Sequence, residues 1–105
     1  MEQKTSISFR GFLVLNKLGA NMFTVYVLYS EKFDKIYIGQ TVDLSERIKE
    51  HNNGLSNYSR KFIPWKLAHS EKFKFRKEAL IREKQLKSSR GRSFIWKEII
   101  GIEKY

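Results

Sequence analysis

Two short segments near the start of the chain have the alternating pattern of β-strands. Residues 23–30 (FTVYVLYS) and 35–40 (KIYIGQ) are rich in β-branched and aromatic side chains, and the four residues between them suit a tight turn. Alternate side chains of a strand point to opposite faces, which places Val25 and Val27 on one face and Tyr26 on the other. We therefore expect an antiparallel hairpin of two strands.

A short amphipathic helix is predicted directly after this hairpin. Asp43 is a typical helix N-cap, and Glu46 three residues later completes a capping-box pattern. Asn52-Asn53-Gly54 is a typical C-terminal signal, so the helix should end near residue 51. The spacing i, i+3, i+4, i+7 puts four side chains on one face of this helix: Leu44, Arg47, Ile48 and His51.

The second half of the chain alternates between loop, strand and helix patterns. A polar loop is expected over residues 55–64, a third strand over 65–72 and a helix over 74–89. The sequence SSRGR at 88–92 should break this helix, and 93–100 should form a closing helix. The apolar set of the long helix is Ala79, Leu80, Ile81 and Leu86. These elements predict an α+β domain with a small three-stranded antiparallel sheet flanked by helices.

Residues 1–21 do not continue this pattern. Their apolar stretch, Gly11–Leu15, is too short for a secretory signal core, and no small-residue cleavage site follows it. Met22 stands directly before the first predicted strand, which is consistent with an upstream start codon. We expect residues 1–21 to be an appendage of unknown role and 22–105 to form the domain. The alternative is an extra helix or strand that packs Phe9, Phe12 and Leu15 on the domain.

Length and composition exclude several classes of protein. A chain of 105 residues suits one domain. It contains no cysteine, which excludes a disulfide framework and a thiolate zinc site and fits a reducing compartment, here the cytoplasm. No apolar run approaches the length of about 20 residues that a membrane span requires.

The charge is strongly positive and unevenly distributed. The formal net charge is +10, yet residues 1–59 carry 7 basic and 6 acidic side chains, whereas residues 60–105 carry 14 basic and 5 acidic. A basic half on a small domain favours a polyanionic partner, because each phosphate contact releases condensed counterions. A generally basic surface without a partner is the alternative explanation.

Candidate chemistry is concentrated in five side chains: Tyr26, Tyr37, Arg47, His51 and Glu83. Each has an ordinary structural explanation. The two tyrosines could form a cross-strand pair, and Arg47 could pair with Glu50 or Asp43. Glu83 at the edge of an apolar stripe could pair with Lys87 at i+4.

Three motifs in order give the sequence a resemblance to a known family. They are Tyr37-Ile38-Gly39-Gln40-Thr41, the helix Asp43-Leu44-x-x-Arg47-x-x-x-His51, and the helix Glu78-Ala79-Leu80-x-x-Glu83-x-x-Leu86-Lys87. They resemble the GIY-YIG nuclease domain, in particular small stand-alone members that are related to the N-terminal domain of an excinuclease. The resemblance covers residues 23–100.

The resemblance implies a role for each matching position. Tyr26 and Tyr37 match the two family tyrosines, with Gly39 as the glycine of the second triplet. Arg47 and His51 match the helix arginine and histidine, and Glu83 matches the metal-binding glutamate. Glu78 on the same helix is a weaker candidate for that role. The sequence departs from the family in its first triplet, Thr24-Val25-Tyr26, and in lacking a clear match to a later asparagine, since Gln85 is not equivalent.

The implied activity is metal-dependent phosphodiester hydrolysis. Glu83 would hold Mg²⁺ or Mn²⁺, because a hydrated Mg²⁺ needs only one or two protein carboxylates. Arg47 would bind the scissile phosphate through its planar fork. Tyr37 is favoured over Tyr26 as the base that activates water, with Tyr26 orienting it. His51 would hold the network or shuttle a proton.

The expected substrate is DNA, and the sequence does not discriminate DNA from RNA. It contains no base-reading motif, so structure-selective or weakly selective cutting in repair, recombination or processing is expected. A non-catalytic nucleic-acid-binding module and a purely structural or protein-interaction domain are the competing classes. The oligomeric state is not determined. The expected nucleic-acid contacts are Gly39, Arg60, Lys61, Lys66, Arg76, Arg82, Lys84, Arg90 and Arg92.

Overall fold

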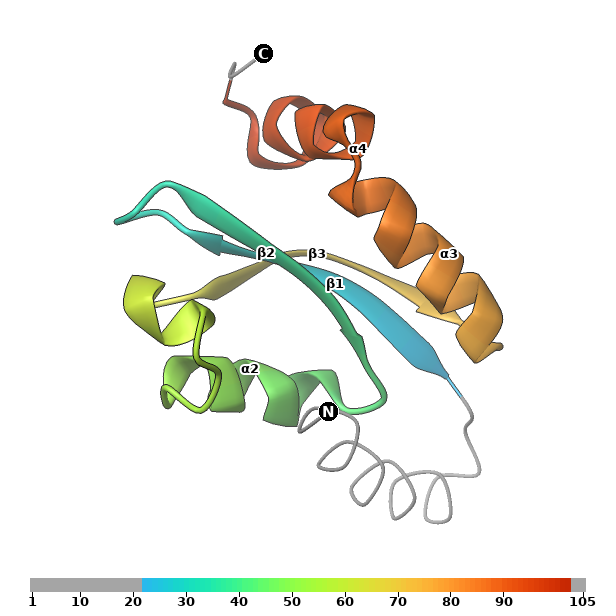
Figure 1. The fold of residues 1–105 in the computed structure, drawn as a ribbon, viewed down its shortest axis with the longest axis horizontal. Coiled ribbons are helices and arrows are strands. Elements are labelled where there is room, and N and C mark those ends of the chain that lie inside the picture. Colours follow the sequence, from blue (N-terminus) through green and yellow to red (C-terminus); the bar gives the residue numbers. More distant parts are fainter. Residues whose placement is uncertain (1–21, 103–105) are drawn as a thin grey trace.

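The computed structural model describes residues 22–102, and they form a three-stranded antiparallel sheet with helices on both faces (Figure 1). The strands are β1 (Phe23–Ser30), β2 (Lys35–Thr41) and β3 (Lys66–Phe73), in the order β2-β1-β3. The predicted α+β class and three-stranded sheet are therefore confirmed. The predictions for residues 1–21 lie outside the described residues.

The central strand β1 is buried on both faces. Val25 pairs with Gln40 and Tyr26 pairs with Gly39. Val25 belongs to the core on one face of the sheet and Tyr26 to the core on the other, so neighbouring side chains of β1 point to opposite faces as predicted. One face carries the larger core, formed by Val25, Val27, Tyr29, Ile36, Ile38, Ala79, Leu86, Ile95 and Trp96. The opposite face carries a smaller core, formed by Tyr26, Leu28 and Trp65 with partly buried Tyr37, Leu44, Ile48, Phe62 and Ile63.

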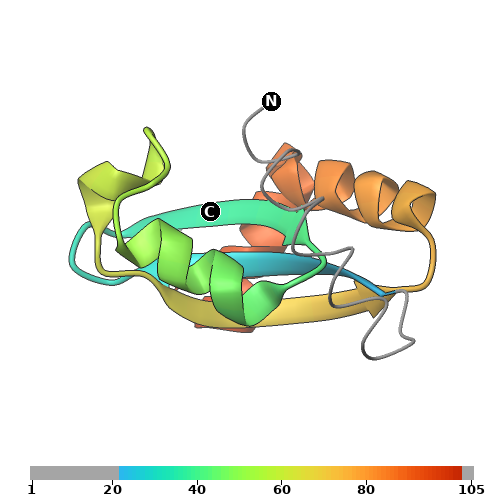
Figure 2. The same ribbon diagram turned by 90° about the horizontal axis from the view of Figure 1, so that it is seen from below.

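The smaller core is covered by α2 (Leu44–Asn52), which crosses the sheet in Figure 2. Asp43 caps this helix as predicted, because its carboxylate accepts a hydrogen bond of 3.2 Å from the Glu46 N–H. The Asp43 N–H itself donates to Thr41 Oγ1 at 3.1 Å. A cap fixed to the end of β2 sets the direction in which the helix leaves the sheet.

The loop after α2 is fixed by side-chain hydrogen bonds. The Asn52 side chain accepts from the Trp65 N–H at 2.6 Å and donates to the Trp65 carbonyl at 2.9 Å. The Trp65 indole N–H donates to the carbonyl of Ser59 at 2.7 Å. These bonds hold the short 3₁₀ helix η1 (Ser59–Phe62) beside α2. The loop predicted over 55–64 thus has a defined helical turn in the structure.

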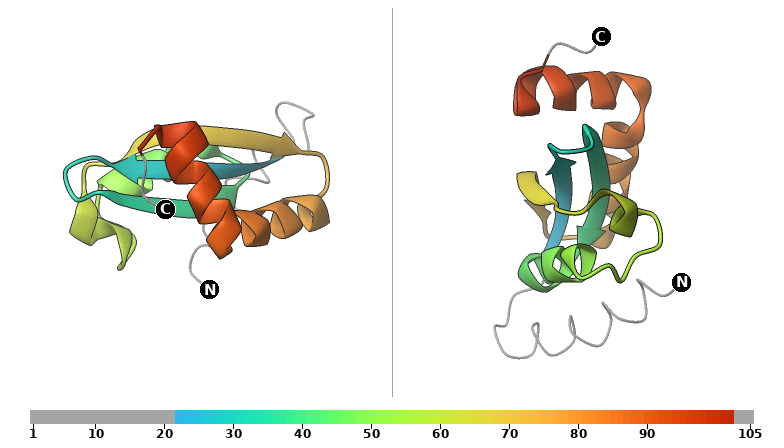
Figure 3. Two further views of the ribbon diagram at one scale, coloured as in Figure 1. Left: turned by 90° about the horizontal axis from the view of Figure 1, so that it is seen from above. Right: turned by 90° about the vertical axis from the view of Figure 1, so that its left-hand side faces the viewer.

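The larger core is covered by α3 (Arg76–Lys87), α4 (Ser89–Phe94) and the π-helix η2 (Ile95–Ile100). In Figure 3 the segment formed by α4 and η2 crosses the sheet, whereas α3 runs alongside it. The predicted break over 88–92 is wrong beyond its first residue. Ser88 alone interrupts the helix, and its hydroxyl accepts from the Gly91 N–H at 3.1 Å to cap α4. No helix within residues 22–102 is long and apolar enough to cross a membrane.

Gly91 explains how two helices meet so tightly at Ser88. A methyl group at Gly91 would overlap the carbonyl oxygen of Gln85 and lie 2.6 Å from the Cα of Leu86. The first turn of α4 therefore packs against the last turn of α3 only because residue 91 has no side chain. The chain therefore bends between α3 and α4 and does not form a single long helix. Of the apolar side chains predicted for α3, Ala79 and Leu86 are buried, whereas Leu80 and Ile81 are exposed.

Candidate active site

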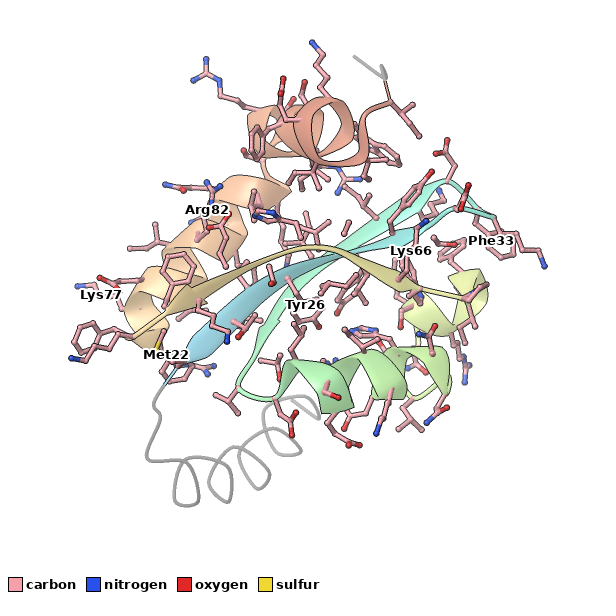
Figure 4. The ribbon with its side chains drawn as sticks, turned by 180° about the vertical axis from the view of Figure 1, so that it is seen from behind. Met22, Tyr26, Phe33, Lys66, Lys77 and Arg82 are labelled. Atoms are coloured by element: carbon pink, nitrogen blue, oxygen red, sulfur yellow. The ribbon has the colours of Figure 1, made fainter. Side chains whose placement is uncertain are left out.

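Four of the five candidate side chains gather between the sheet and α2: Tyr26, Tyr37, Arg47 and His51. Tyr26 points from β1 toward α2 in Figure 4. Tyr37 pairs across the strands with Leu28, so the two tyrosines are diagonal neighbours and not the direct cross-strand pair considered from sequence. Their rings stack with centroids 6.3 Å apart and planes inclined by 23°.

A chain of buried polar groups leads away from Tyr26. The phenol oxygen of Tyr26 lies 3.0 Å from His51 Nε2, and His51 Nδ1 lies 2.8 Å from Ser59 Oγ. All three residues are fully buried. A buried imidazole that has a partner on each ring nitrogen is fixed in orientation, so His51 is held for a specific hydrogen-bonding role.

Arg47 enters the same cluster from the preceding turn of α2. Its Nε donates to the Tyr26 oxygen at 3.4 Å, and its Nη1 donates to Glu50 Oε1 at 2.7 Å. Its third nitrogen, Nη2, is buried and has no hydrogen-bond partner among residues 22–102. The pairing with Glu50 that was considered from sequence is confirmed, and it leaves one buried donor of Arg47 unsatisfied.

Burial controls the protonation of this cluster. Burial raises the pKa of the Tyr26 phenol, and the neighbouring Tyr37 adds to the increase, whereas Arg47 opposes it. Burial also lowers the pKa of His51 to about 4, assisted by the positive charge of Arg47. At neutral pH Tyr26 therefore keeps its proton and His51 is neutral. Since Arg47 Nε already donates to the Tyr26 oxygen, we assign the Tyr26 proton to His51 Nε2 and the ring proton to Nδ1, facing Ser59.

The depressed pKa of His51 makes the stability of the fold depend on pH. Between pH about 6.5 and about 4 the unfolded chain binds a proton at this histidine that the folded chain does not bind. The contribution is fully present above pH 6.5 and is lost as the pH falls toward 4, with a total on the order of 3 kcal/mol. Urea unfolding at several pH values should show this slope in the wild type and a shallower slope in His51→Gln. Parallel curves for the two proteins would contradict the assignment.

Gly39 has a structural role at this site. A Cβ atom there would lie 2.7 Å from the phenol oxygen of Tyr26 and 3.2 Å from Cε1 of Tyr37. Gly39 is buried inside β2, which continues beyond it to Thr41, and its contact with nucleic acid stays a prediction. Its lack of a side chain makes room for the two phenols beside the edge strand.

Glu83 lies apart from the four clustered side chains. Its Oε1 accepts from Gln40 Nε2 at 3.2 Å, and its Oε2 pairs with Lys87 Nζ at 2.7 Å. Gln40 pairs with Val25, so it lies on the face of the sheet opposite to Tyr26. The five candidate side chains therefore do not line one open pocket in this structure: Tyr26, Arg47 and His51 are buried, and Glu83 approaches from the other face.

The edge strand β2 nevertheless brings the two groups near each other. Gln40, which binds Glu83, directly follows Gly39, against which Tyr26 packs. The negative charge of Glu83 is close enough to contribute to the raised pKa of Tyr26. Figure 3 shows that β2, at the edge of the sheet, is near both α2 and α3. A substrate lying across this edge would meet groups from both faces.

The side chains around Glu83 suit a metal ion that keeps most of its water ligands, and not an ion enclosed by protein ligands. Among residues 22–102 no cluster of three or more His, Cys, Asp or Glu side chains could enclose a metal. Mg²⁺ keeps several of its waters and is commonly held by one or two carboxylates, so Glu83 alone is compatible with it. The pair with Lys87 involves a half-exposed lysine, and such pairs are weak enough for an ion to displace.

Most of the predicted nucleic-acid contacts are exposed cations. Arg60, Lys61, Lys66, Arg76, Lys84 and Arg90 are exposed, and Arg92 is half-buried. Arg82 is different, because its guanidinium binds Glu71 of β3 through two hydrogen bonds of 2.9 and 3.0 Å (Figure 4). That contact lowers the pKa of Glu71 and ties α3 to the sheet, so the Arg82 guanidinium already has a protein partner, and its contact with nucleic acid stays a prediction.

Sequence reasoning missed Ser59 and Gln40 as members of the site. Ser59 sits in a polar loop without periodicity, and only the folded loop brings it to His51. Gln40 directly follows Gly39 in the Tyr37–Thr41 motif, and this position was the one sequence signal that could have indicated its place in the site. Glu50 was considered only as an ordinary partner of Arg47, although it is buried in the cluster.

The GIY-YIG catalytic domain matches residues 22–98. A UPF0213 protein from Haloquadratum walsbyi is 42% identical over 65 residues, which are 60% of this chain and 73% of that protein. A UPF0213 protein from Clostridium perfringens is 42% identical over 64 residues, which are 60% and 68% of the two chains.

One solved structure is also similar. The solution NMR structure of a UPF0213 protein from Bacillus halodurans has 30% sequence identity and a TM-score of 0.45, and the match covers 70% of this chain and 81% of that one. The family match spans most of the chain and contains all five candidate side chains. The chain belongs to the GIY-YIG family.

Proposed function

We propose that this chain is a metal-dependent endonuclease that hydrolyses phosphodiester bonds in DNA, with a role in repair, recombination or processing. Membership of the GIY-YIG family supports the nuclease class. The observation that carries the proposal is the buried Ser59–His51–Tyr26 chain with the unsatisfied Nη2 of Arg47 beside it. A buried polar network with an open donor costs stability, and such costs are typical of functional sites.

Tyr37 is the proposed contact with the attacking water. It is the only one of the four clustered side chains that is partly exposed, and its hydroxyl forms no hydrogen bond with another residue of the described part. Its ring packs on the edge of His51, with centroids 4.5 Å apart, and on Tyr26. This packing fixes the phenol in one orientation, so its oxygen can hold the attacking water molecule. It can take the proton of that water only as the phenolate, after the phenol has released its own proton to solvent.

In this proposal Tyr26 and His51 position Tyr37 and do not contact the attacking water themselves. Tyr26 keeps its proton at neutral pH and donates it in a hydrogen bond to His51. The pair therefore orients the Tyr37 ring and the Arg47 guanidinium, while Ser59 fixes the imidazole. These groups are positioning residues, because their buried atoms do not reach the solvent side of the site.

Arg47 would bind a phosphate oxygen through Nη2. A guanidinium donates charge-assisted hydrogen bonds to phosphate, and Nη2 is its one nitrogen without a partner in the described structure. The side chain is only 5% exposed, so the groups that cover it must move before a phosphate reaches it. Glu50 binds the guanidinium through Nη1 at 2.7 Å, so Nη2 is not engaged in that pair.

Glu83, with Gln40 beside it, is the proposed holder of the metal ion at the edge of β2. A bound divalent ion stabilises the negative charge that develops on the phosphate during hydrolysis. In the absence of an ion, Lys87 neutralises the carboxylate. Exchange of Lys87 for the ion would leave the bond from Gln40 in place and so keep the carboxylate oriented.

A comparison of nucleic-acid substrates tests the proposed activity. Branched, flapped and linear DNA and matching RNA would be incubated with the protein in Mg²⁺, in Mn²⁺ and in EDTA. We expect DNA cleavage that requires the divalent ion, stops with EDTA and is faster on structured than on linear DNA. Binding of all substrates without cleavage under any condition would contradict the endonuclease proposal.

One observation favours a second candidate, a nucleic-acid-binding module without catalysis. Both functional charges are already paired inside the protein, Arg47 with Glu50 and Glu83 with Lys87. A module of this kind would bind the same DNA without any dependence on divalent ions. The substrate comparison therefore separates the two candidates by whether cleavage products form.

A further inference from the structure

A cluster of aromatic and cationic side chains lies at the hairpin end of the sheet and outside the site described above. We call it the aromatic–cationic surface; it consists of Lys32, Phe33, Lys35, Tyr58, Arg60, Lys61 and Phe62. The first three belong to the turn and start of β2, and the others to η1 and its N-cap. Figure 4 shows Phe33 at the hairpin turn, beside η1.

The rings of this surface form a continuous series that reaches Tyr37. The Phe33 and Phe62 centroids are 5.6 Å apart, and those of Phe62 and Tyr58 are 5.3 Å apart. Tyr58 in turn lies 6.4 Å from Tyr37, with planes inclined by 31°. Aromatic side chains therefore extend from the proposed water-activating phenol to the outer end of the domain.

Cations accompany the rings along this path. Lys32 Nζ lies 5.4 Å from the Phe33 ring centroid, and Lys35 Nζ lies 5.4 Å from that of Phe62. Arg60 and Lys61 add two exposed positive charges on η1. Rings that stack bases next to cations that neutralise phosphates are the two features by which proteins hold single-stranded nucleic acid.

Packing of the fold accounts for only part of this surface. Phe62 is half-buried against Trp65 and anchors the hairpin turn. Phe33 and Tyr58 remain 40% and 50% exposed, and each contacts Phe62 from a different element. Single exposed aromatic residues are common on protein surfaces, but linked rings with flanking cations indicate a binding surface.

We propose that the aromatic–cationic surface binds an unpaired single-stranded segment of the substrate, with its bases stacked on Phe33 and Tyr58. This inference rests on the proposed endonuclease function, since it names the part of the substrate that flanks the scissile phosphate. Stacking on rings is tolerant of base sequence, so the surface selects unpaired structure and not a sequence. It directs the strand toward Tyr37 through the contact between Tyr58 and Tyr37.

Binding measurements on aromatic variants test this inference. Affinities of the full chain for a single-stranded oligonucleotide and for a blunt duplex would be measured in EDTA, for the wild type, Phe33→Ala, Tyr58→Ala and Phe75→Ala. Phe75 is the matched control, because it is an exposed phenylalanine with Lys74 over its ring at 5.8 Å, at the start of α3. We expect each of the first two variants to lose about tenfold in single-strand affinity while duplex affinity changes less than about twofold.

A double variant that removes two cations separates the contribution of stacking from that of charge. Arg60→Ala with Lys61→Ala should weaken binding of both oligonucleotides and reduce the salt dependence of the affinity. The slope of log affinity against log salt should become shallower by about 1.4 for single strands, which corresponds to two phosphate contacts.

Quenching of 2-aminopurine fluorescence in the single strand should fall in Phe33→Ala but stay unchanged in Phe75→Ala. Unchanged single-strand affinity in Phe33→Ala and Tyr58→Ala, or an equal loss in Phe75→Ala, would overturn the inference.

The tests of the surface and of the proposed function fail independently. EDTA prevents metal-dependent cleavage, so the affinities report only binding. A wild type that shows the expected stacking yet never cleaves DNA would refute the endonuclease and retain the surface. A wild type that cleaves with Mg²⁺ while the aromatic variants bind normally would retain the endonuclease and refute the surface.

Discussion

Replacement of Glu83 by glutamine should lower the rate of metal-dependent cleavage by about 1000-fold, which corresponds to about 4 kcal/mol of transition-state stabilisation. The amide has nearly the shape of the carboxylate and can still accept the hydrogen bond from Gln40, but it carries no charge to hold a divalent ion. Initial rates with saturating DNA in Mg²⁺ would measure the loss. DNA affinity in EDTA should stay within about twofold, because Glu83 is not among the cationic contacts.

Glu78→Gln is the matched control for this prediction. Glu78 lies in the first turn of the same helix and is exposed, so its loss should leave the cleavage rate nearly unchanged. The unfolding free energy of Glu83→Gln should change by less than about 1 kcal/mol, because the pair with half-exposed Lys87 contributes little. Equal rates for Glu83→Gln and the wild type would remove Glu83 from the mechanism.

Replacement of Arg47 by methionine should destabilise the fold by about 3–5 kcal/mol. The change removes the guanidinium from Glu50, whose side chain is buried, and it removes the donor to the Tyr26 oxygen. A loss of this size is a large fraction of the roughly 5–15 kcal/mol that is typical of domains. Urea unfolding at pH 7 would measure it, with Lys49→Met on the exposed side of the same helix as the control.

A double variant shows whether buried charge is the cause. Arg47→Met combined with Glu50→Gln removes both charges, so we expect it to recover more than half of the lost stability. A double variant that is less stable than Arg47→Met alone would show that Glu50 does not depend on Arg47. Neither protein should cleave DNA, because Arg47 is the proposed phosphate contact.

The elements of the fold were predictable where local signals and tertiary packing agree. The first strand has the predicted bounds, Phe23–Ser30, and Asp43 caps α2 as expected. The break in the helix was predicted too long, over 88–92, because SSRGR contains residues that commonly break helices. In the structure Ser88 caps a new helix, and Gly91 permits the tight contact between α3 and α4. That contact is tertiary and leaves no periodic signal in the sequence.

The members of the candidate site were predictable to a different degree. Helical spacing places Arg47 and His51 on the buried side of α2, and strand alternation places Tyr26 opposite them. The position of Glu83 relative to the sheet depends on how α3 approaches β2, and no local pattern determines it. Ser59 depends on the loop held by Asn52 and Trp65, so its contact with His51 was equally inaccessible.

Binding of Mn²⁺ followed by NMR tests the central claim most directly. A paramagnetic ion broadens the amide signals of nearby residues, and a ¹⁵N-labelled chain of 12.5 kDa suits the measurement. With a DNA oligonucleotide present, low concentrations of Mn²⁺ should first broaden the signals of Glu83, Gln40 and Gly39, and Glu83→Gln should abolish the effect. Broadening centred on another acidic group, such as Glu71 beside His69, or none near Glu83, would contradict a metal-dependent site at the edge of β2.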